Sequence, residues 1–396
     1  MRVFVTGFGV ISAIGEKVEE NLNNLRQGRT GIGKAHYLDS RYSEFLPFGE
    51  VKRSNEELYQ KLDLQRKGVP RTELLAYTAF QEAIEHAGLS SDQLHSWDTS
   101  LVSATTVGGM SNMQALYNDA KGIDEGSPYH DTYSNGMHTQ RLAEEYAIKG
   151  LTCTINTACS ASANAIMVGT RMIRTGRSKR VLVGGTDSLA KFTVNGFNAL
   201  QVLSEEMCRP FDENREGLNL GEGAAYLVLE AEDACREKRR YCEVLGYGNS
   251  NDAFHPSSLS EEAIGVTAAM EKALSTAGTV PSEIDHINAH GTATENNDWV
   301  ESNGLKKVFG EKVPSYNSTK SYTGHTLAAA GAIEAVYSIL SLYDQELYPS
   351  LNCTHPISSF PMEPIRAYEA GTSIEKVMSN SFGFAGNCTS VVLGKA

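Results

Sequence analysis

The chain has 396 residues, of which 41% are hydrophobic and 21% are charged. These proportions are typical of a folded globular protein and exclude a disordered or fibrous one. Its 48 acidic residues outnumber its 35 basic residues, and the net charge is −13. Because such a chain repels phosphates, we expect neither nucleic acid nor an anionic membrane as a partner. No run approaches the 18 apolar residues of a membrane-spanning helix, so we expect no such segment.

The cysteines and the N-terminus both favour a cytoplasmic protein. The seven cysteines are odd in number, are scattered along the chain and contain no C-x-x-C pair. We therefore expect reduced thiols, with neither disulfides nor a zinc site. The first residues, Met1–Gly7, lack the long apolar stretch of a signal peptide.

Short apolar runs that end in glycine or polar residues predict buried strands, and wider apolar stripes predict helices. The first half contains a predicted strand at 3–9, a helix at 72–87, a strand at 154–157, a helix after 160, strands at 180–185 and 225–230, and a charged helix through Arg240. The second half contains strands at 243–248 and 284–288, a helix at about 326–343, and a closing hairpin of 376–380 and 390–393. Interleaved strands and helices predict a layered α/β fold.

Two correspondences between the halves indicate an old internal duplication. The segment from Ile155 to Ile166 has a strand, a polar turn and a small-residue helix, and so does the segment from Tyr316 to Ile333. A glycine-rich turn precedes a closing strand at 220–224 and again at 384–386. No low-complexity linker separates the halves, so we expect residues 1–240 and 241–396 to pack as one body.

Cys159 is the first candidate for chemistry. It lies where a predicted strand ends and a predicted helix begins. The N–H groups at a helix N-terminus lower the pKa of a thiol and can hold a developing anion. The thiolate is the reactive form, so such a cysteine suits attack on a thioester. The alternative is a small buried thiol that packs the junction between strand and helix.

A second group of polar residues lies in the C-terminal half. His290 follows a predicted strand, and His286 lies four residues earlier, about 13 Å away along that strand, which is too far for both to bind one metal ion. Lys320 and His325 lie at the predicted start of the helix that contains Glu334. A lysine there opposes the helix dipole and needs a partner or a function. The alternative for each is an ordinary turn residue.

In combination, these motifs resemble those of the β-ketoacyl-[acyl-carrier-protein] synthases, most closely the elongating condensing enzyme KAS II. The matching segments run nearly end to end: Val3–Ser12, Thr157–Ala161, Arg209–Asp212, Leu220–Gly223, Asn288–Thr292, Lys320–His325 and Asn380–Phe384. The resemblance implies a thiolase fold, in which duplicated α/β halves form a layered α-β-α-β-α architecture. It also implies a dimer, either of identical subunits or of this chain with a related subunit.

The resemblance also implies roles for individual residues. Cys159 corresponds to the acylated nucleophile, and His290 and His325 correspond to the histidines that assist decarboxylation of the malonyl group and condensation. Lys320 and Glu334 correspond to the lysine and glutamate beside them, and a lysine cation near His325 would keep that imidazole neutral.

Further positions follow in the same way from the resemblance. Asp298 and Glu301 match acidic positions that support the polar network. Phe384 matches the gating phenylalanine, whose backbone N–H joins that of Cys159 in an oxyanion hole. Val107 matches a side chain at the bottom of the acyl pocket, and its small size favours a medium to long acyl chain.

The implied reaction is the decarboxylative condensation of malonyl-[acyl-carrier-protein] with an acyl group on Cys159, in fatty-acid elongation, with neither a cofactor nor a metal. Two departures affect the last motif: Ala385 replaces a glycine, and Cys388 replaces an amide near the site. These departures and a short segment before Arg209 favour a specialised ketosynthase of a polyene or polyketide-like pathway as the alternative. A thiolase, a starter-unit synthase, a non-catalytic subunit resembling a chain-length factor, and a structural subunit are weaker alternatives.

The expected partner is an acidic acyl carrier protein, which needs a local basic surface on this acidic chain. Lys61, Arg66, Lys67 and Arg71 lie within eleven residues before a predicted helix. We expect these four residues to form a docking patch. The alternative is a solvated basic turn.

Overall fold

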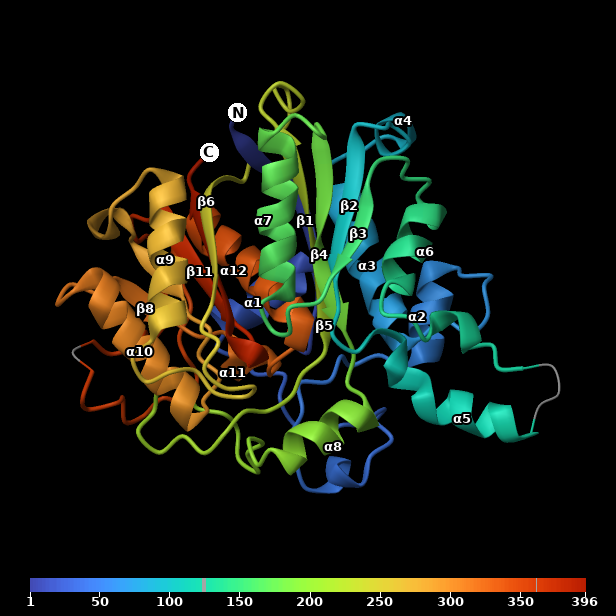
Figure 1. The fold of residues 1–396 in the computed structure, drawn as a ribbon, viewed down its shortest axis with the longest axis horizontal. Helices are drawn as coiled ribbons and strands as arrows, with labels where there is room; N and C mark the ends of the chain where they lie inside the picture. Colours follow the sequence, from blue (N-terminus) through green and yellow to red (C-terminus); the bar gives the residue numbers. More distant parts are fainter. Residues whose placement is uncertain (123–125, 361) are drawn as a thin grey trace.

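The computed structural model describes residues 1–122, 126–360 and 362–396. Ten of its strands follow one another in the hydrogen-bonded order β3-β2-β4-β5-β1-β6-β12-β11-β7-β8 (Figure 1). Their bounds are β1 Val3–Ile11, β2 Thr99–Ala104, β3 Thr152–Ile155, β4 Arg180–Asp187, β5 Gly223–Ala231, β6 Cys242–Asn251, β7 His286–Asn288, β8 Ser315–Asn317, β11 Lys376–Phe382 and β12 Asn387–Gly394. The predicted strands are therefore present, with ends that differ by a few residues.

The strand order is symmetrical about the contact between β1 and β6. Moving outwards from that contact, each half continues with two antiparallel neighbours, β5 and β4 on one side and β12 and β11 on the other. Two parallel strands then complete each half, β2 and β3 or β7 and β8. Only Phe4 and Val5 of β1 pair with β6 across the centre. The same five-stranded unit thus occurs twice, and the predicted duplication is confirmed.

Four helices complete the layers. α3 (Arg71–His86) covers β1 and β5 on one outer face, and α9 (Ile264–Ala277) covers β6 and β12 on the other. α7 (Ala161–Arg174) and α12 (Ala330–Asp344) lie between the halves, because each contacts strands of both. The result is the expected α-β-α-β-α arrangement, with α7 and α12 in equivalent positions after β3 and β8.

The remaining helices lie mainly at the ends and sides of the layers (Figure 1). They are α1 Val18–Arg26, α2 Asn55–Leu62, α4 Ser91–Leu94, α5 Met113–Gly122, α6 Met137–Glu145, α8 Lys191–Ala199, α10 Glu295–Phe309 and α11 Lys320–Thr323. A small pair of strands, β9 Glu346–Leu347 and β10 Glu369–Ala370, lies apart from the main order. The expected helix through Arg240 is wrong, since turns fill that segment. Its Lys238 turns back to the buried carboxylate of Glu230, at 3.0 Å, and no apolar stripe supports a helix there.

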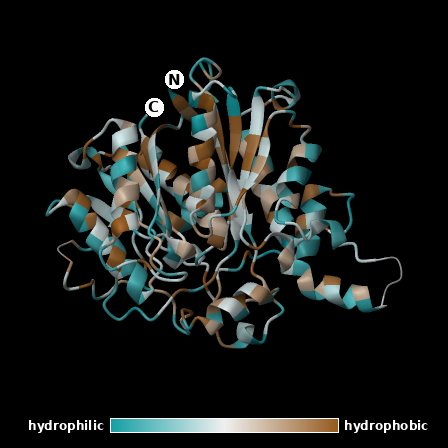
Figure 2. Ribbon diagram, in the orientation of Figure 1, coloured by the Kyte–Doolittle hydropathy of each residue, from teal (hydrophilic) through white to brown (hydrophobic). Residues whose placement is uncertain are grey.

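The core follows the strands and the two central helices, where the hydrophobic residues concentrate (Figure 2). α12 is buried from Ala330 to Leu342, so it is apolar nearly all round. The stretch Leu327–Asp344 has the length and composition of a membrane span, but 89% of it is buried inside the protein. It is therefore a helix of the protein core. The short apolar runs in the sequence did not show that this helix is buried on nearly all sides.

Candidate active site

The turn between β3 and α7 carries Cys159. Ser160 is the N-cap of α7, and Ala158 adopts a left-handed conformation with φ of 53°. Asn387, the first residue of β12, accepts hydrogen bonds from the Ser160 hydroxyl at 2.7 Å and the Asn164 amide at 2.9 Å. These bonds fix the nucleophile turn of one half to the closing strand of the other.

Burial dominates the chemistry of the Cys159 thiol. Its side chain is 4% exposed, and burial raises the thiol pKa to about 11, although the N–H groups of Phe384 and of Cys159 itself and the charge of Lys320 oppose this shift. The lowered pKa that we expected from the helix N-terminus is therefore wrong for the ligand-free site. Desolvation of the anion exceeds the stabilisation that the N–H groups supply. Both N–H groups nevertheless contact the sulfur of Cys159.

The loop between β11 and β12 closes over the thiol. The ring of Phe384 stacks on that of Phe197 from α8, with the centroids 5.4 Å apart and the planes at 18°. A Cβ on Gly383 would lie 2.7 Å from the Thr157 carbonyl oxygen, so only glycine permits this close approach. Ala385 adopts φ of 63°, and its N–H donates to the Pro256 carbonyl at 2.7 Å. Ala385 thus adopts a left-handed conformation, which alanine disfavours, in the turn beside Cys159.

His290 lies just beyond the end of β7. The carboxylate of Glu301 on α10 accepts the N–H of His290 at 2.9 Å and that of Gly291 at 2.8 Å. The Asn380 amide also donates to Glu301, at 3.3 Å. Burial raises the pKa of Glu301 to about 7. Glu301 therefore fixes the backbone of the histidine and does not touch its ring.

Asp298 supports the neighbouring loop in the same way. Its carboxylate accepts the N–H of Phe211 at 2.8 Å and that of Ala293 at 3.1 Å. Glu301 thus holds the backbone of His290, and Asp298 holds the loop that follows it.

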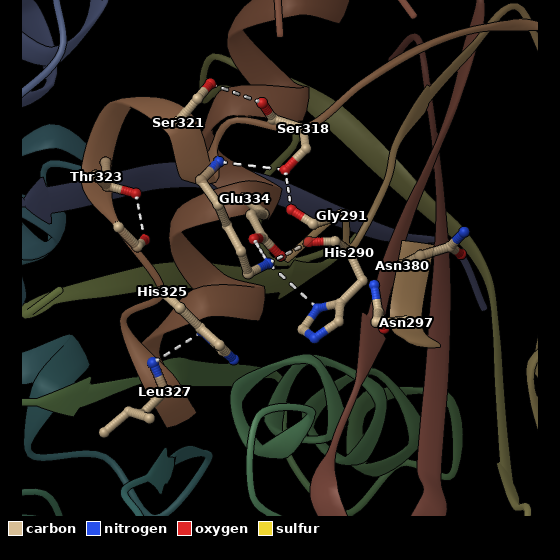
Figure 3. A network of polar contacts seen from close by, with 12 residues as sticks. His290, Gly291, Asn297, Ser318, Ser321, Thr323, His325, Leu327, Glu334 and Asn380 are labelled. Atoms are coloured by element: carbon tan, nitrogen blue, oxygen red, sulfur yellow. Dashed lines mark hydrogen bonds and ion pairs between the residues drawn. The ribbon is translucent and has the colours of Figure 1, made fainter. Parts of the chain in front are cut away.

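Lys320 lies between His290 and Glu334. Its ammonium is 3.2 Å from Nδ1 of His290, donates to the His290 carbonyl at 2.7 Å and forms a buried ion pair with Glu334 (Figure 3). Lys320 starts the short helix α11, which ends at Gly324 with φ of 70°, whereas Glu334 lies on α12. The helix that we expected at about 326–343 is therefore present as α12, and Lys320 belongs to a separate short helix. The turn between the two helices carries His325. The direct contact of the ammonium is also with His290, not with His325.

The two histidine rings meet edge to face, with their centroids 5.3 Å apart. The N–H of Leu327 approaches Nδ1 of His325 at 3.3 Å, a contact that favours the tautomer with the proton on Nε2. Burial lowers the pKa of both histidines well below the ordinary value, and the charge of Lys320 lowers it further. Both imidazoles are therefore neutral near pH 7 and can donate hydrogen bonds.

Two cavities meet at Cys159. The first, of about 350 Å³, is lined by Cys159 together with His290, His325 and Phe384. The second, of about 460 Å³, also has Cys159 and Phe384 in its wall and is mainly apolar. Its wall includes Val107, Met110, Phe192, Phe197 and Leu327. Val107 thus lines the apolar cavity beside the thiol, where the resemblance places it.

The predicted docking residues do not form one free basic surface. Arg71 is nearly buried and pairs with the buried Glu222 at 2.7 Å. Lys61 pairs with Glu16 at 2.9 Å, and Arg66 approaches Glu144 at 3.5 Å. Arg66 and Lys67 remain exposed. Arg71 therefore does not belong to a free basic surface, because the buried Glu222 engages it. Lys61 is exposed as well, so docking at Lys61, Arg66 and Lys67 stays a prediction.

Cys388 also lies elsewhere than expected. It is fully buried in the apolar cluster under α9, and the amide of Asn387 takes the polar role on the opposite face of the strand. Within the described ranges, no group of three or more His, Cys, Asp or Glu side chains is arranged to hold a metal ion.

Three residues at the site were not singled out from the sequence. Phe197 stacks on the gate, Leu327 contacts His325 and the apolar cavity, and Asp187 lies behind the wall of that cavity. Asp187 offered one signal, because it is a lone acidic residue at the end of a buried strand. Phe197 and Leu327 lie in segments without a motif.

Comparison with known proteins identifies the family. The β-ketoacyl synthase N-terminal domain matches residues 1–234, and the β-ketoacyl synthase C-terminal domain matches residues 241–354. The chain is 32% identical to 3-oxoacyl-[acyl-carrier-protein] synthase 2 of Coxiella burnetii over 100% of this chain and 98% of that protein.

Solved structures agree with these matches. The ishigamide ketosynthase/chain length factor has a TM-score of 0.92 at 31% identity, covering 100% of this chain and 99% of that one. The AntDE:AntF complex, a type II polyketide synthase acyl-carrier protein with its ketosynthase, has a TM-score of 0.89 at 27% identity, with coverage of 100% and 99%. The chain belongs to the β-ketoacyl synthase family of condensing enzymes and has their thiolase-like fold.

Proposed function

We propose that this protein is a 3-oxoacyl-[acyl-carrier-protein] synthase that elongates fatty acids. It condenses malonyl-[acyl-carrier-protein] with an acyl group held on Cys159 and releases CO₂. The observation that carries this proposal is the meeting of Cys159, His290 and His325 at one cavity, with a second, apolar cavity behind the thiol. The N-terminal half, residues 1–240, supplies the nucleophile, and the C-terminal half, residues 241–396, supplies both histidines and the gate.

The first step transfers the acyl group. The sulfur of Cys159 attacks the carbonyl carbon of the acyl thioester, and the bond from that carbon to the carrier sulfur breaks. The proton of Cys159 passes to the carrier sulfur, which leaves as a thiol. The N–H groups of Cys159 and Phe384 stabilise the oxyanion. Because burial raises the thiol pKa, the sulfur carries its proton near pH 7 and must lose it during the attack. The acyl chain occupies the cavity that Val107 lines.

The second and third steps use the histidines. Loss of CO₂ from the malonyl thioester leaves an enolate, and the neutral rings of His290 and His325 donate hydrogen bonds to its oxygen. The enolate carbon then attacks the acyl carbonyl on Cys159, the carbon–sulfur bond breaks, and the 3-oxoacyl thioester leaves. Lys320 keeps His290 neutral and oriented, while Glu334 offsets the buried charge of the ammonium.

The partner that this function requires is an acyl carrier protein, loaded with an acyl or a malonyl group. The AntDE:AntF complex, which pairs a ketosynthase with its carrier protein, supports this assignment. A dimer, of identical subunits or with a related subunit, and a cytoplasmic location complete the proposal.

A second candidate is a specialised ketosynthase of a polyene or polyketide-like pathway. The similarity to the ishigamide ketosynthase/chain length factor favours it, as do the aromatic walls that Phe192 and Phe197 give to the apolar cavity. The two candidates share the reaction and differ in the acyl chain.

Separate half-reactions test the assignment. Cys159→Ala should abolish condensation but leave malonyl-carrier protein able to bind and lose CO₂. His290→Ala and His325→Ala should each reduce decarboxylation by about 10²–10³, the usual cost of a lost oxyanion donor, and leave acylation of Cys159 measurable. CO₂ release and acyl-enzyme formation, followed by mass spectrometry, separate the steps. Wild-type decarboxylation in both histidine variants, or acylation at another residue, would exclude this site.

A further inference from the structure

Asp187, the last residue of β4, receives an unusual number of hydrogen bonds for a buried carboxylate. One oxygen accepts the Thr105 hydroxyl at 2.6 Å and the N–H of Val107 at 3.0 Å. The other accepts the Thr106 hydroxyl at 2.5 Å and the N–H of Ala328 at 2.9 Å. The N–H of Thr106 lies within 3.1 Å of both oxygens.

These donors come from two segments that lie far apart in the sequence. Thr105–Val107 follows β2, and the side chains of Thr106 and Val107 line the apolar cavity. Ala328 follows Leu327, which lines the same cavity and whose N–H approaches Nδ1 of His325. Asp187 itself lies behind both segments and does not line the cavity.

The charge of Asp187 makes this arrangement costly. The side chain is fully buried, and within the described ranges no basic side chain forms an ion pair with it. A buried carboxylate without a counter-ion is tolerated only when its oxygens are fully hydrogen-bonded. Five donors from two segments meet that need, and they do so only while both segments stay in place.

We propose that Asp187 is a positioning residue that holds the floor of the acyl cavity and the His325 turn in one fixed geometry. The proposal rests on the proposed function, since it assigns the cavity to the acyl chain and His325 to the malonyl enolate. Both groups must meet at Cys159 within a fraction of an ångström for condensation. Asp187 sets their relative position without touching either substrate.

Asp187→Asn tests this role because the amide keeps the shape and loses one acceptor. The two threonine hydroxyls can reverse and accept a hydrogen bond, but backbone N–H groups cannot. If the amide nitrogen faces Thr106, the N–H of Ala328 is left without an acceptor. If it faces Thr105, the N–H of Val107 is left without one. The first orientation releases the His325 turn, and the second removes one bond from the segment Thr105–Val107. Because the proposal makes the two segments hold one geometry, either loss should loosen both.

Asp212→Asn is the matched control. Asp212 is equally buried and also accepts backbone N–H groups, those of Asn214, Thr354 and His355. It lines neither of the cavities at Cys159. A loss of stability alone should therefore be similar in the two variants.

Hydrogen exchange measured by mass spectrometry on the full-length protein reads the coupling directly. In Asp187→Asn, peptides that cover 105–108 and 325–330 should both exchange about tenfold faster, and in Asp212→Asn neither should. Faster exchange in only one segment, or in neither, would overturn the proposal. If Asp187→Asn does not fold, Thr106→Val removes one donor and should give the same pattern at smaller amplitude.

Kinetic measurements on the same variants test whether the loss of coupling slows condensation. With a medium-chain primer, Asp187→Asn should lower kcat for condensation about tenfold and change KM for malonyl-carrier protein less than about twofold. Acetyl transfer to Cys159 should be unchanged. Unaltered condensation despite faster exchange would overturn the positioning role. Failure of the proposed function is distinguishable, because wild-type protein would then not condense, whereas the exchange comparison needs no activity.

Discussion

The ammonium of Lys320 lies 3.2 Å from Nδ1 of His290 and forms an ion pair with Glu334 in a fully buried site. Burial lowers the pKa of His290 and the charge of Lys320 lowers it further, so the ring stays neutral. Burial raises the pKa of Glu334 to about 7, and the Lys320 charge opposes that shift. The protonation of His290 and of Glu334 therefore depends on the cation that lies between them.

Lys320→Met should raise the pH at which the enzyme loses activity on acidification. Without the cation, the pKa of His290 moves up towards its ordinary value, so the ring becomes protonated at a higher pH and no longer donates as a neutral group. Glu334 becomes protonated in the same variant and leaves no buried charge. The measurement is malonyl decarboxylation from pH 5 to pH 8. Lys320→Arg, which keeps the charge, should retain the wild-type acid limb, and an unshifted limb in Lys320→Met would contradict the coupling.

The pH dependence of Cys159 follows from its raised pKa of about 11. Below that pH only a small fraction of the sulfur is thiolate, and this fraction increases about tenfold for each pH unit. Alkylation of Cys159 by iodoacetamide should therefore accelerate by about that factor per unit from pH 7 to pH 10, with no plateau. Peptide mapping separates Cys159 from the other cysteines. A plateau below pH 8 would show that the N–H groups outweigh burial.

The fold could be predicted from the sequence to a large extent. Strands and helices alternate along the chain, and each has a clear apolar run. The repeated order of elements around Ile155 and Tyr316 predicted the duplication that the symmetrical strand order shows. The short helix that begins at Lys320 could not be predicted, because its end depends on the left-handed conformation of Gly324. Glycine in that segment permits the turn but does not require it.

The site could be predicted through its motifs but not through its energetics. The nucleophile and both histidines meet as the resemblance implies. The direction of the Cys159 pKa shift depends on burial by segments that are distant in the sequence. The residues next to Cys159 in the sequence do not indicate that burial. The same holds for Arg71, whose partner Glu222 lies 151 residues away. That ion pair removes Arg71 from the free surface that we expected for docking.

Ala385→Gly tests the strain in the gate. Ala385 holds φ of 63°, which costs an alanine about 1 kcal/mol more than a glycine. Glycine should therefore leave stability within about 1 kcal/mol of wild type, since relief of strain offsets greater freedom of the unfolded chain. It should also speed acylation by bulky primers, because the loop opens more easily.

The matched control for the gate is Ala147→Gly, at an exposed position with φ of 47° outside the site. Its effect on stability should be similar, and its acylation rates should equal those of wild type. Chemical denaturation and stopped-flow acylation supply the two measurements. Equal acylation in both variants would show that the conformation of Ala385 does not limit the gate.

Charge reversal at Arg66 and Lys67, two of the three exposed docking residues, tests the carrier surface that remains. Arg66→Glu with Lys67→Glu should raise KM for carrier-protein substrates, because the chain is otherwise acidic and the long-range field repels an acidic partner. The effect should decline with added salt, as expected for charges that water screens. A short pantetheine thioester, which needs no protein docking, should react as before. Equal losses on both substrates would indicate misfolding.

Val107→Phe tests the depth of the acyl cavity. Val107 is 3% exposed and lines the cavity of about 460 Å³ beside Cys159. A phenylalanine there fills space that the end of a medium or long chain needs, and each displaced methylene costs about 0.8 kcal/mol of burial. The longest accepted primer should shorten by several carbons, while acetyl and butyryl primers should react at wild-type rates.

Val202→Phe is the control for general crowding, since Val202 lines only the cavity that contains the histidines. It should slow primers of every length alike, because the added ring narrows the cavity that contains the histidines and leaves the apolar cavity unchanged. Competition among carrier-bound primers from two to sixteen carbons, read by mass spectrometry of the acylated enzyme, compares the variants directly. An unchanged length profile in Val107→Phe would place the acyl chain elsewhere. It would also remove the reason for Asp187 to fix the segment that carries Val107.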